Sequence, residues 1–168
     1  DTWNGCTGLT VFPNRTWTNA TTLVRSWMGC TSLTTFPAST FAAGVDFTSA
    51  WQGNIGMTTF GIIVISGNGV TFTDSWNGCT GLTAFPNLTW TKATTLIRSW
   101  MGCTALTTFP ASAFPLGANF TSAWQGCTGM TTFGIITCAA ATNFTSTWQG
   151  CTGFTSAFPT LVLTAATT

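Results

Sequence analysis

Seven cysteines carry most of the reactive chemistry open to this chain of 168 residues. Six of them stand three residues after a tryptophan, and one copy of this Trp-x-Gly-Cys phrase has asparagine instead. The resulting column is Cys6, Cys30, Asn54, Cys79, Cys103, Cys127 and Cys151. Such thiols can pair as disulfides, bind a metal ion, act as nucleophiles or stay reduced and buried.

Metal binding and catalysis both lack the partners that cysteine needs. The chain has no histidine and no Cys-x-x-Cys spacing, so we expect neither a metal site nor a cofactor. A nucleophilic thiol needs an activating base, and the three acidic residues, Asp1, Asp46 and Asp74, lie far apart in the sequence. The sequence therefore predicts that the protein is not an enzyme.

Charge is scarce along the whole chain: 4% of residues are charged and the formal net charge is +1. This balance provides no electrostatic attraction to nucleic acid or to an anionic membrane. The longest run of large apolar residues is Ile62 to Ile65, far below the about 20 residues of a membrane-spanning helix. We therefore expect a folded protein that binds no nucleic acid and does not insert into a membrane.

Seven tryptophans mark an internal repeat, with successive spacings of 24, 24, 25, 24, 24 and 24 residues. They are Trp3, Trp27, Trp51, Trp76, Trp100, Trp124 and Trp148. After each tryptophan, glycine follows two residues later, a large apolar residue six later, and phenylalanine nine later in the first six copies. Residues 1–41 also match 74–114, a 73-residue super-repeat of three coils. We predict a single repeat domain over residues 1–168, with coils starting near these tryptophans.

Each unit is too small to bury its apolar columns alone, so stacking of like units predicts a solenoid with a continuous core. The run Leu-Thr-x-Phe-Pro-x is expected to form the strand, paired in parallel between coils on one face. The glycine after each tryptophan predicts a turn with positive φ. The expected fold class is mostly β, with about seven coils of 24 residues and few or no long helices.

The phrases RSWMGCTSLTTFP and SAWQGCTGMTTF resemble the BspA-type leucine-rich repeats, including the related mycoplasma-type surface repeats of about 25 residues. The resemblance covers nearly the whole chain. The chain departs from that family in having tryptophan in place of the first phenylalanine, Phe-Pro in place of later leucines, and far less charge. It implies a right-handed leucine-rich-repeat solenoid on a cell or particle surface, without a shared catalytic activity.

The same resemblance bears on the candidate site residues. In such repeats asparagine and cysteine share a buried ladder column bonded to backbone, so Asn54 favours reduced thiols over disulfides. The tryptophan column is expected in the core rather than on a glycan-stacking face, and so is Cys138.

Threonine is common enough for chance to explain most N-x-Thr sequons, but five remain candidate N-glycosylation sites. These are Asn14, Asn19, Asn87, Asn119 and Asn143.

The two ends of the sequence resemble halves of one coil. The chain opens at Asp1 in mid-unit, and residues 164–168 follow Leu163 without reaching another tryptophan. We therefore expect the rod to continue, by head-to-tail self-association or in a longer polypeptide.

The function that the sequence favours is structural. We expect a non-catalytic extracellular or surface protein of a cell or virus particle, assembling end to end into a fibre or filament. The alternative is an adhesin-type binding module that recognises a glycan or host protein through a solenoid face. The monotony of threonine, serine and alanine outside the core favours the structural role.

Overall fold

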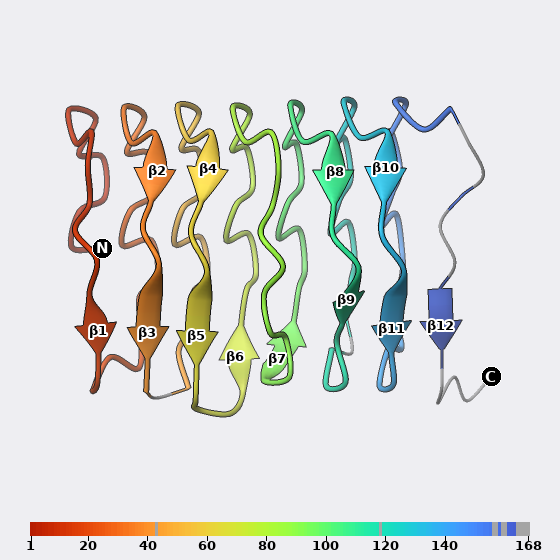
Figure 1. Cartoon of the computed structure of the whole chain (residues 1–168), viewed down its shortest axis with the longest axis horizontal. Helices are drawn as coiled ribbons and strands as arrows, with labels where there is room; N and C mark the ends of the chain where they lie inside the picture. Colours follow the sequence, from red (N-terminus) through yellow and green to blue (C-terminus); the bar gives the residue numbers. More distant parts are fainter. Residues whose placement is uncertain (43, 118, 156–157, 159–160, 164–168) are drawn as a thin grey trace.

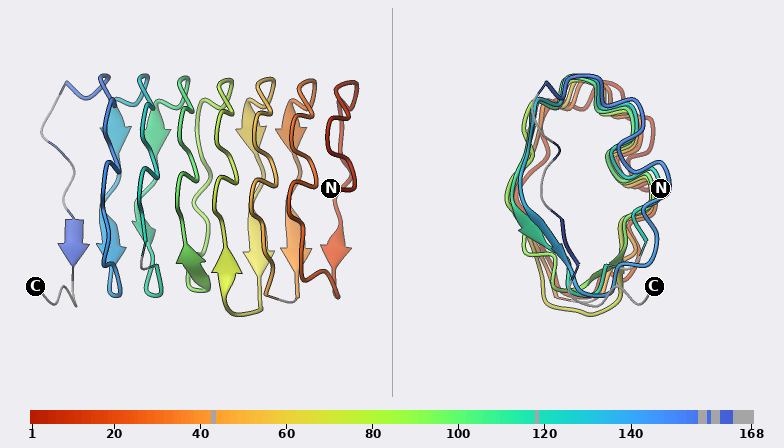
Figure 2. Two further views of the ribbon diagram at one scale, coloured as in Figure 1. Left: turned by 180° about the vertical axis from the view of Figure 1, so that it is seen from behind. Right: turned by 90° about the vertical axis from the view of Figure 1, so that its right-hand side faces the viewer.

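The computed structural model describes residues 1–42, 44–117, 119–155, 158 and 161–163, and within them the chain is a solenoid without helices. In Figure 1 the strands of the near face run downward while the chain advances from left to right, so the solenoid is right-handed. The end-on view in Figure 2 shows the coils superposed around one axis. The predicted mostly-β solenoid is thus confirmed. It has about six turns, slightly fewer than expected, because seven tryptophans bound six intervals.

The coils are numbered one to seven from Trp3, Trp27, Trp51, Trp76, Trp100, Trp124 and Trp148. The first line of strands on the near face uses the expected Thr-Phe run. It consists of β2 (Thr35–Phe36), β4 (Thr59–Phe60), β8 (Thr108–Phe109) and β10 (Thr132–Phe133). All pairs are parallel, and residues 24 apart face each other, as Thr35 faces Thr59.

The residues after Leu163, on which the predicted match between the two chain ends depends, lie outside the described part.

A second line of strands continues down the same face. It consists of β1 (Thr16–Trp17), β3 (Ser39–Phe41), β5 (Ile63–Ile65), β9 (Ser112–Ala113), β11 (Ile136–Cys138) and β12 (Leu161–Leu163). The expected run, residues 33–38 in coil two, therefore holds only the first line of strands, and the second line begins after it. Proline lacks an N–H and fixes φ, so the ladder is interrupted after phenylalanine, as at Pro37 and Pro110.

A third, shorter pairing was not expected from the sequence. The strands β6 (Val70–Thr71) and β7 (Ala93–Thr95) pair in parallel where the chain ascends. Isolated parallel bridges extend the same line, from Thr22 to Asp46 and from Asn119 to Asn143. Every coil is therefore hydrogen-bonded to its neighbours on more than one side.

Two files of aromatic rings fill the interior. Successive tryptophans of the repeat stack at centroid distances of 5.0–5.7 Å. Phenylalanines nine residues further on form a second file at 5.4–5.7 Å, from Phe12 to Phe133. Rings of the two files meet edge to face, as Phe36 meets Trp27 at 4.9 Å. This arrangement suits aromatic quadrupoles and makes the core continuous along the axis.

Left-handed backbone marks two columns of each coil. The glycine two residues after each tryptophan has φ between 68° and 76°, as predicted for Gly5 and its equivalents. The position two residues before tryptophan also has positive φ, although its residues are not glycine. They are Arg25, Ser49, Asp74, Arg98, Ser122 and Ser146. A single residue in this conformation is tolerated where the surrounding hydrogen bonds determine the backbone.

Gly134 allows coil six to approach coil five closely. A Cβ atom at Gly134 would lie 2.1 Å from the backbone nitrogen of Ala111 and 2.5 Å from the carbonyl carbon of Pro110. We expect Gly134→Ala to lower the free energy of unfolding by about 1–3 kcal/mol, because overpacking shifts backbone. Gly8→Ala is the matched control, since a Cβ atom at Gly8 would meet nothing within 4 Å. Equal losses in urea denaturation of the two variants would contradict this explanation.

Candidate functional site

The cysteine column forms a ladder of thiol-to-carbonyl hydrogen bonds along the core. Each Sγ donates to the carbonyl oxygen of the tryptophan that opens the preceding coil, at 3.0–3.1 Å. The donors are Cys30, Cys79, Cys103, Cys127 and Cys151. All seven cysteines are free thiols; Cys6 is exposed and Cys151 is half-buried. The ladder thus uses the thiol as a small buried donor that links one coil to the next.

Burial makes the inner thiols of the ladder poor nucleophiles, whereas a side-chain hydrogen bond with Cys127 lowers the pKa of Cys151 in the terminal coil. Loss of solvation raises the pKa of Cys79 to about 12 and the pKa of Cys103 well above its ordinary value of 9.0. Burial also raises the pKa of Cys138 to about 12, and Cys138 lies in the core. Because only thiolates react readily, the buried column is suited to packing rather than to chemistry.

Asn54 occupies the cysteine column without reproducing its hydrogen bond. The residue is fully buried, and both of its amide atoms lack a partner among the described residues. A buried polar atom left without a partner costs about 1–3 kcal/mol.

We therefore expect Asn54→Cys to raise the free energy of unfolding by about 1–3 kcal/mol, because the thiol can donate to the Trp27 carbonyl. Urea denaturation followed by tryptophan fluorescence measures the change. The reverse exchange in the next triplet, Cys127→Asn, is the matched control and should destabilise. An unchanged midpoint for Asn54→Cys would show that the buried amide has no energetic cost, and would contradict this prediction. That is the result expected if water bonded to both amide atoms.

The structure places the tryptophan column inside the solenoid. Trp27, Trp51, Trp76, Trp100 and Trp124 have no exposed surface, and Trp3 and Trp148 in the terminal coils are half-buried. Trp90 is buried and Trp17 half-buried in a neighbouring column. These rings cannot form a glycan-stacking platform on the outside of coils two to six.

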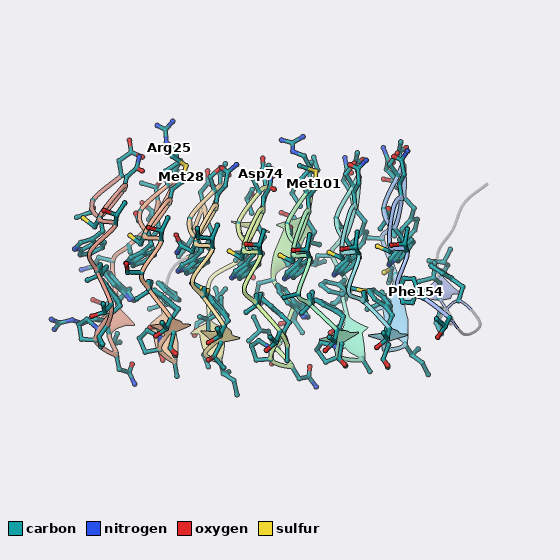
Figure 3. All side chains as sticks on the ribbon, turned by 90° about the horizontal axis from the view of Figure 1, so that it is seen from above. Arg25, Met28, Asp74, Met101 and Phe154 are labelled. Carbon is teal, nitrogen blue, oxygen red and sulfur yellow. The ribbon has the colours of Figure 1, made fainter. Side chains whose placement is uncertain are left out.

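Two ion pairs link neighbouring coils at the positive-φ column. Arg25 contacts Asp1 at 2.9 Å, and Arg98 contacts Asp74 at 2.7 Å. Figure 3 shows Arg25, Met28, Asp74 and Met101 along the edge of the rod opposite the near-face strands. Reading the sequence by columns would have revealed the signal, because Asp, Arg and Ser alternate there with the three-coil period. Each pair joins an aspartate to the arginine at the same position of the following coil.

The five sequons fall into two groups. Asn14, Asn19 and Asn87 are exposed. The side-chain oxygens of Asn119 and Asn143 instead accept hydrogen bonds from the backbone N–H groups of Thr121 and Thr145, at 2.9 and 2.8 Å. These last two asparagines help to shape the turn before tryptophan, while the first three are accessible to modification.

The exposed surface of both strand lines is uncharged. We call outer sheet face the residues seven, eight, eleven and thirteen positions after tryptophan in coils two to six. Its first column consists of Thr34, Thr58, Thr83, Thr107 and Thr131, and each hydroxyl after the first donates to the preceding threonine carbonyl at 3.1–3.5 Å. The second consists of Thr35, Thr59, Ala84, Thr108 and Thr132. The third and fourth consist of Ala38, Ile62, Asn87, Ala111 and Ile135, and of Thr40, Val64, Thr89, Ala113 and Thr137.

A shallow groove of about 440 Å³ lies on this face, over β9. Its lining includes Asn87 and Thr89 of coil four, Ala111 and Ala113 of coil five, and Ile135 of coil six. The two alanines are small, so they leave a hollow between larger neighbours. The sequence held a signal for it, since Asn, Ala and Ile recur with the three-coil period in the third column.

Other kinds of site are not seen in the part of the chain that the structure describes. No three cysteine or aspartate residues gather closely enough there to hold a metal ion. No helix in that part has the length and apolar character to cross a bilayer. Comparison of the chain with protein-family models, curated proteins and solved structures finds no match, so membership of the BspA-type family stays a prediction.

Proposed function

We infer that this protein is a non-catalytic structural solenoid whose coils extend end to end into a fibre on a cell or virus surface. The observation that supports this function is that every coil presents the same groups to the next one. Backbone N–H groups donate toward the following coil, as Trp27 donates to Ala50 and Trp76 to Ser99, both at 2.8 Å. The aromatic files and the thiol ladder repeat with the same period, so one coil can dock on any other.

The terminal coils offer these groups to a partner. Trp3 and Leu9 in coil one, and Trp148 and Phe154 in coil seven, belong to core columns but are only half-buried; Phe154 is labelled in Figure 3. Phe158 in the same last coil is 50% exposed. A coil of a second copy would cover them as neighbouring coils cover Trp76, and the low net charge adds little repulsion. Contacts of this head-to-tail kind produce filaments when they do not close.

Sedimentation velocity over a concentration series tests end-to-end assembly. We expect species larger than a dimer to grow with concentration, and Phe158→Lys to suppress them by placing a charge in the docking surface. Ile55→Lys is the control, because Ile55 is similarly exposed at 54% but lies at a turn within coil three. Growth beyond the dimer that survives Phe158→Lys, or that Ile55→Lys abolishes equally, would argue against end-to-end docking.

The groove supports a second candidate, an adhesin that binds a glycan or host protein through the outer sheet face. Threonine hydroxyls and the Asn87 amide are suitable hydrogen-bond partners for sugar hydroxyls. A glycan array is the direct test. A saturable hit that Asn87→Ala removes would favour the adhesin, and its absence would leave the structural role favoured.

A further inference from the structure

The third column of the outer sheet face alternates between projecting and small side chains. Ile62 in coil three and Ile135 in coil six are 54% and 55% exposed. Each follows a coil with alanine at the same position, Ala38 in coil two and Ala111 in coil five. The groove over Ala111 is the hollow that this alternation leaves. Projections therefore stand on coils three and six, and small alanine side chains on coils two and five.

This pattern is complementary to itself under one two-fold rotation. An axis that lies in the face, parallel to the strands and through coil four, brings coil three of one copy over coil five of the other. The same rotation brings coil six over coil two. Ile62 then meets Ala111 and Ile135 meets Ala38, while Asn87 faces its own equivalent. We propose that the outer sheet face binds the same face of a second copy in this register, with the two rods antiparallel.

The fourth column fits the same register. Val64, which is 53% exposed, comes opposite Ala113, so a second projection enters the same hollow. Thr40 comes opposite Thr137, and Thr89 faces its own equivalent. The two asparagine side chains at the axis can each donate and accept, so their amides can hydrogen-bond to each other. Packed sheets interdigitate in this way at about 10 Å separation.

Charge and area are both sufficient for the pairing. None of the twenty residues of the outer sheet face is charged, so the face meets its copy without repulsion between side chains. Five coils at about 4.8 Å and seven residues at about 3.3 Å span roughly 550 Å² per copy, or about 1,100 Å² in total. Specific interfaces generally exceed about 1,000 Å². An isologous pair of this kind is the commonest form of oligomer.

Light scattering coupled to size exclusion tests the pairing. We expect a concentration-dependent dimer whose dissociation constant rises at least about 100-fold in the double variant Ile62→Lys/Ile135→Lys, because each lysine is buried without a partner. The matched control is Ile55→Lys, with 54% exposure away from the face. A wild-type chain that stays monomeric throughout, or a control that dissociates equally, would overturn the proposal. A glycan that binds Asn87 without disturbing the dimer would also overturn it.

A charge-exchange pair tests the register itself. We expect Ile135→Lys to weaken the dimer and Ile135→Lys/Ala38→Glu to restore it, since these positions face each other across the axis. Ile135→Lys/Ala111→Glu carries the same charges in the same column but in the wrong register, so it should not restore the dimer. Rescue by both pairs, or by neither, would contradict the two-fold through coil four. Phe158→Lys leaves this face intact and should not affect the dimer. Failure of the face-to-face proposal can therefore be distinguished from failure of end-to-end docking.

Discussion

Trp76→Ala is expected to lower the free energy of unfolding by about 3–5 kcal/mol, the range for a large aromatic deleted from a core. The ring stacks on Trp51 at 5.3 Å and on Trp100 at 5.4 Å. It also meets Phe60 and Phe85 edge to face at 5.1 and 4.8 Å. Because coil four is central, the resulting cavity would interrupt both aromatic files at once.

The measurement is urea denaturation followed by near-ultraviolet circular dichroism. Trp76→Phe is the matched control, since it keeps a stacked ring and removes an indole Nε1 that has no partner among the described residues. We expect the phenylalanine variant to lose much less stability than the alanine variant. A loss below about 1 kcal/mol for Trp76→Ala would be far from the core range and would contradict a continuous aromatic core.

Alkaline pH is expected to unfold the protein because the buried thiols can ionise only after unfolding. Cys79 has a pKa of about 12 in the fold, against 9.0 for an ordinary thiol, and burial also raises the pKa of Cys103. Above pH 9 the folded state therefore holds more protons than the unfolded state, and stability falls as pH rises toward 12. Each such thiol contributes about 1.4 kcal/mol per pH unit, so these two together remove about 3 kcal/mol per unit.

Urea midpoints measured between pH 8 and pH 11 test this dependence. The chain has no tyrosine, so cysteine dominates the titration in this range. Cys103→Ser retains a hydroxyl that can donate to the Trp76 carbonyl but does not titrate, and its slope should be shallower by about 1.4 kcal/mol per pH unit. A flat wild-type profile, or an unchanged slope in the variant, would mean that the thiols are not buried in the folded protein.

The parts of the fold that depend on the 24-residue period could be predicted from the sequence. The tryptophan spacing determines which rings stack, and Gly5 and its equivalents have the positive φ expected of a tight turn. The stacking follows because a repeat can bury its apolar columns only against a copy of itself, and the turn follows because glycine readily adopts positive φ. The period predicts Trp27, Trp51 and Trp76 in one file for this reason, and their rings stack at 5.5 and 5.3 Å.

The features that could not be predicted depend on how one coil sits on the next. The break between β2 and β3 arises at Pro37, whose effect on the ladder depends on the neighbouring backbone. The positive φ of Asp74 and Arg98 contradicts their intrinsic preference and is imposed by hydrogen bonds to adjacent coils. The Asn54 amide, which has no partner among the described residues, is also a tertiary feature, since its column suggested a bonded side chain.

The central claim is that coils are interchangeable because each docks through the same groups. Deletion of residues 28–100 removes 73 residues, or three coils, and joins Trp27 to Met101, the equivalent of Met28. We predict a folded rod, about 14 Å shorter by small-angle scattering, that keeps the native near-ultraviolet tryptophan signal. Deletion of residues 28–88 instead removes about two and a half coils and should unfold the chain. Loss of the tryptophan signal in the first variant, or its retention in the second, would contradict the account.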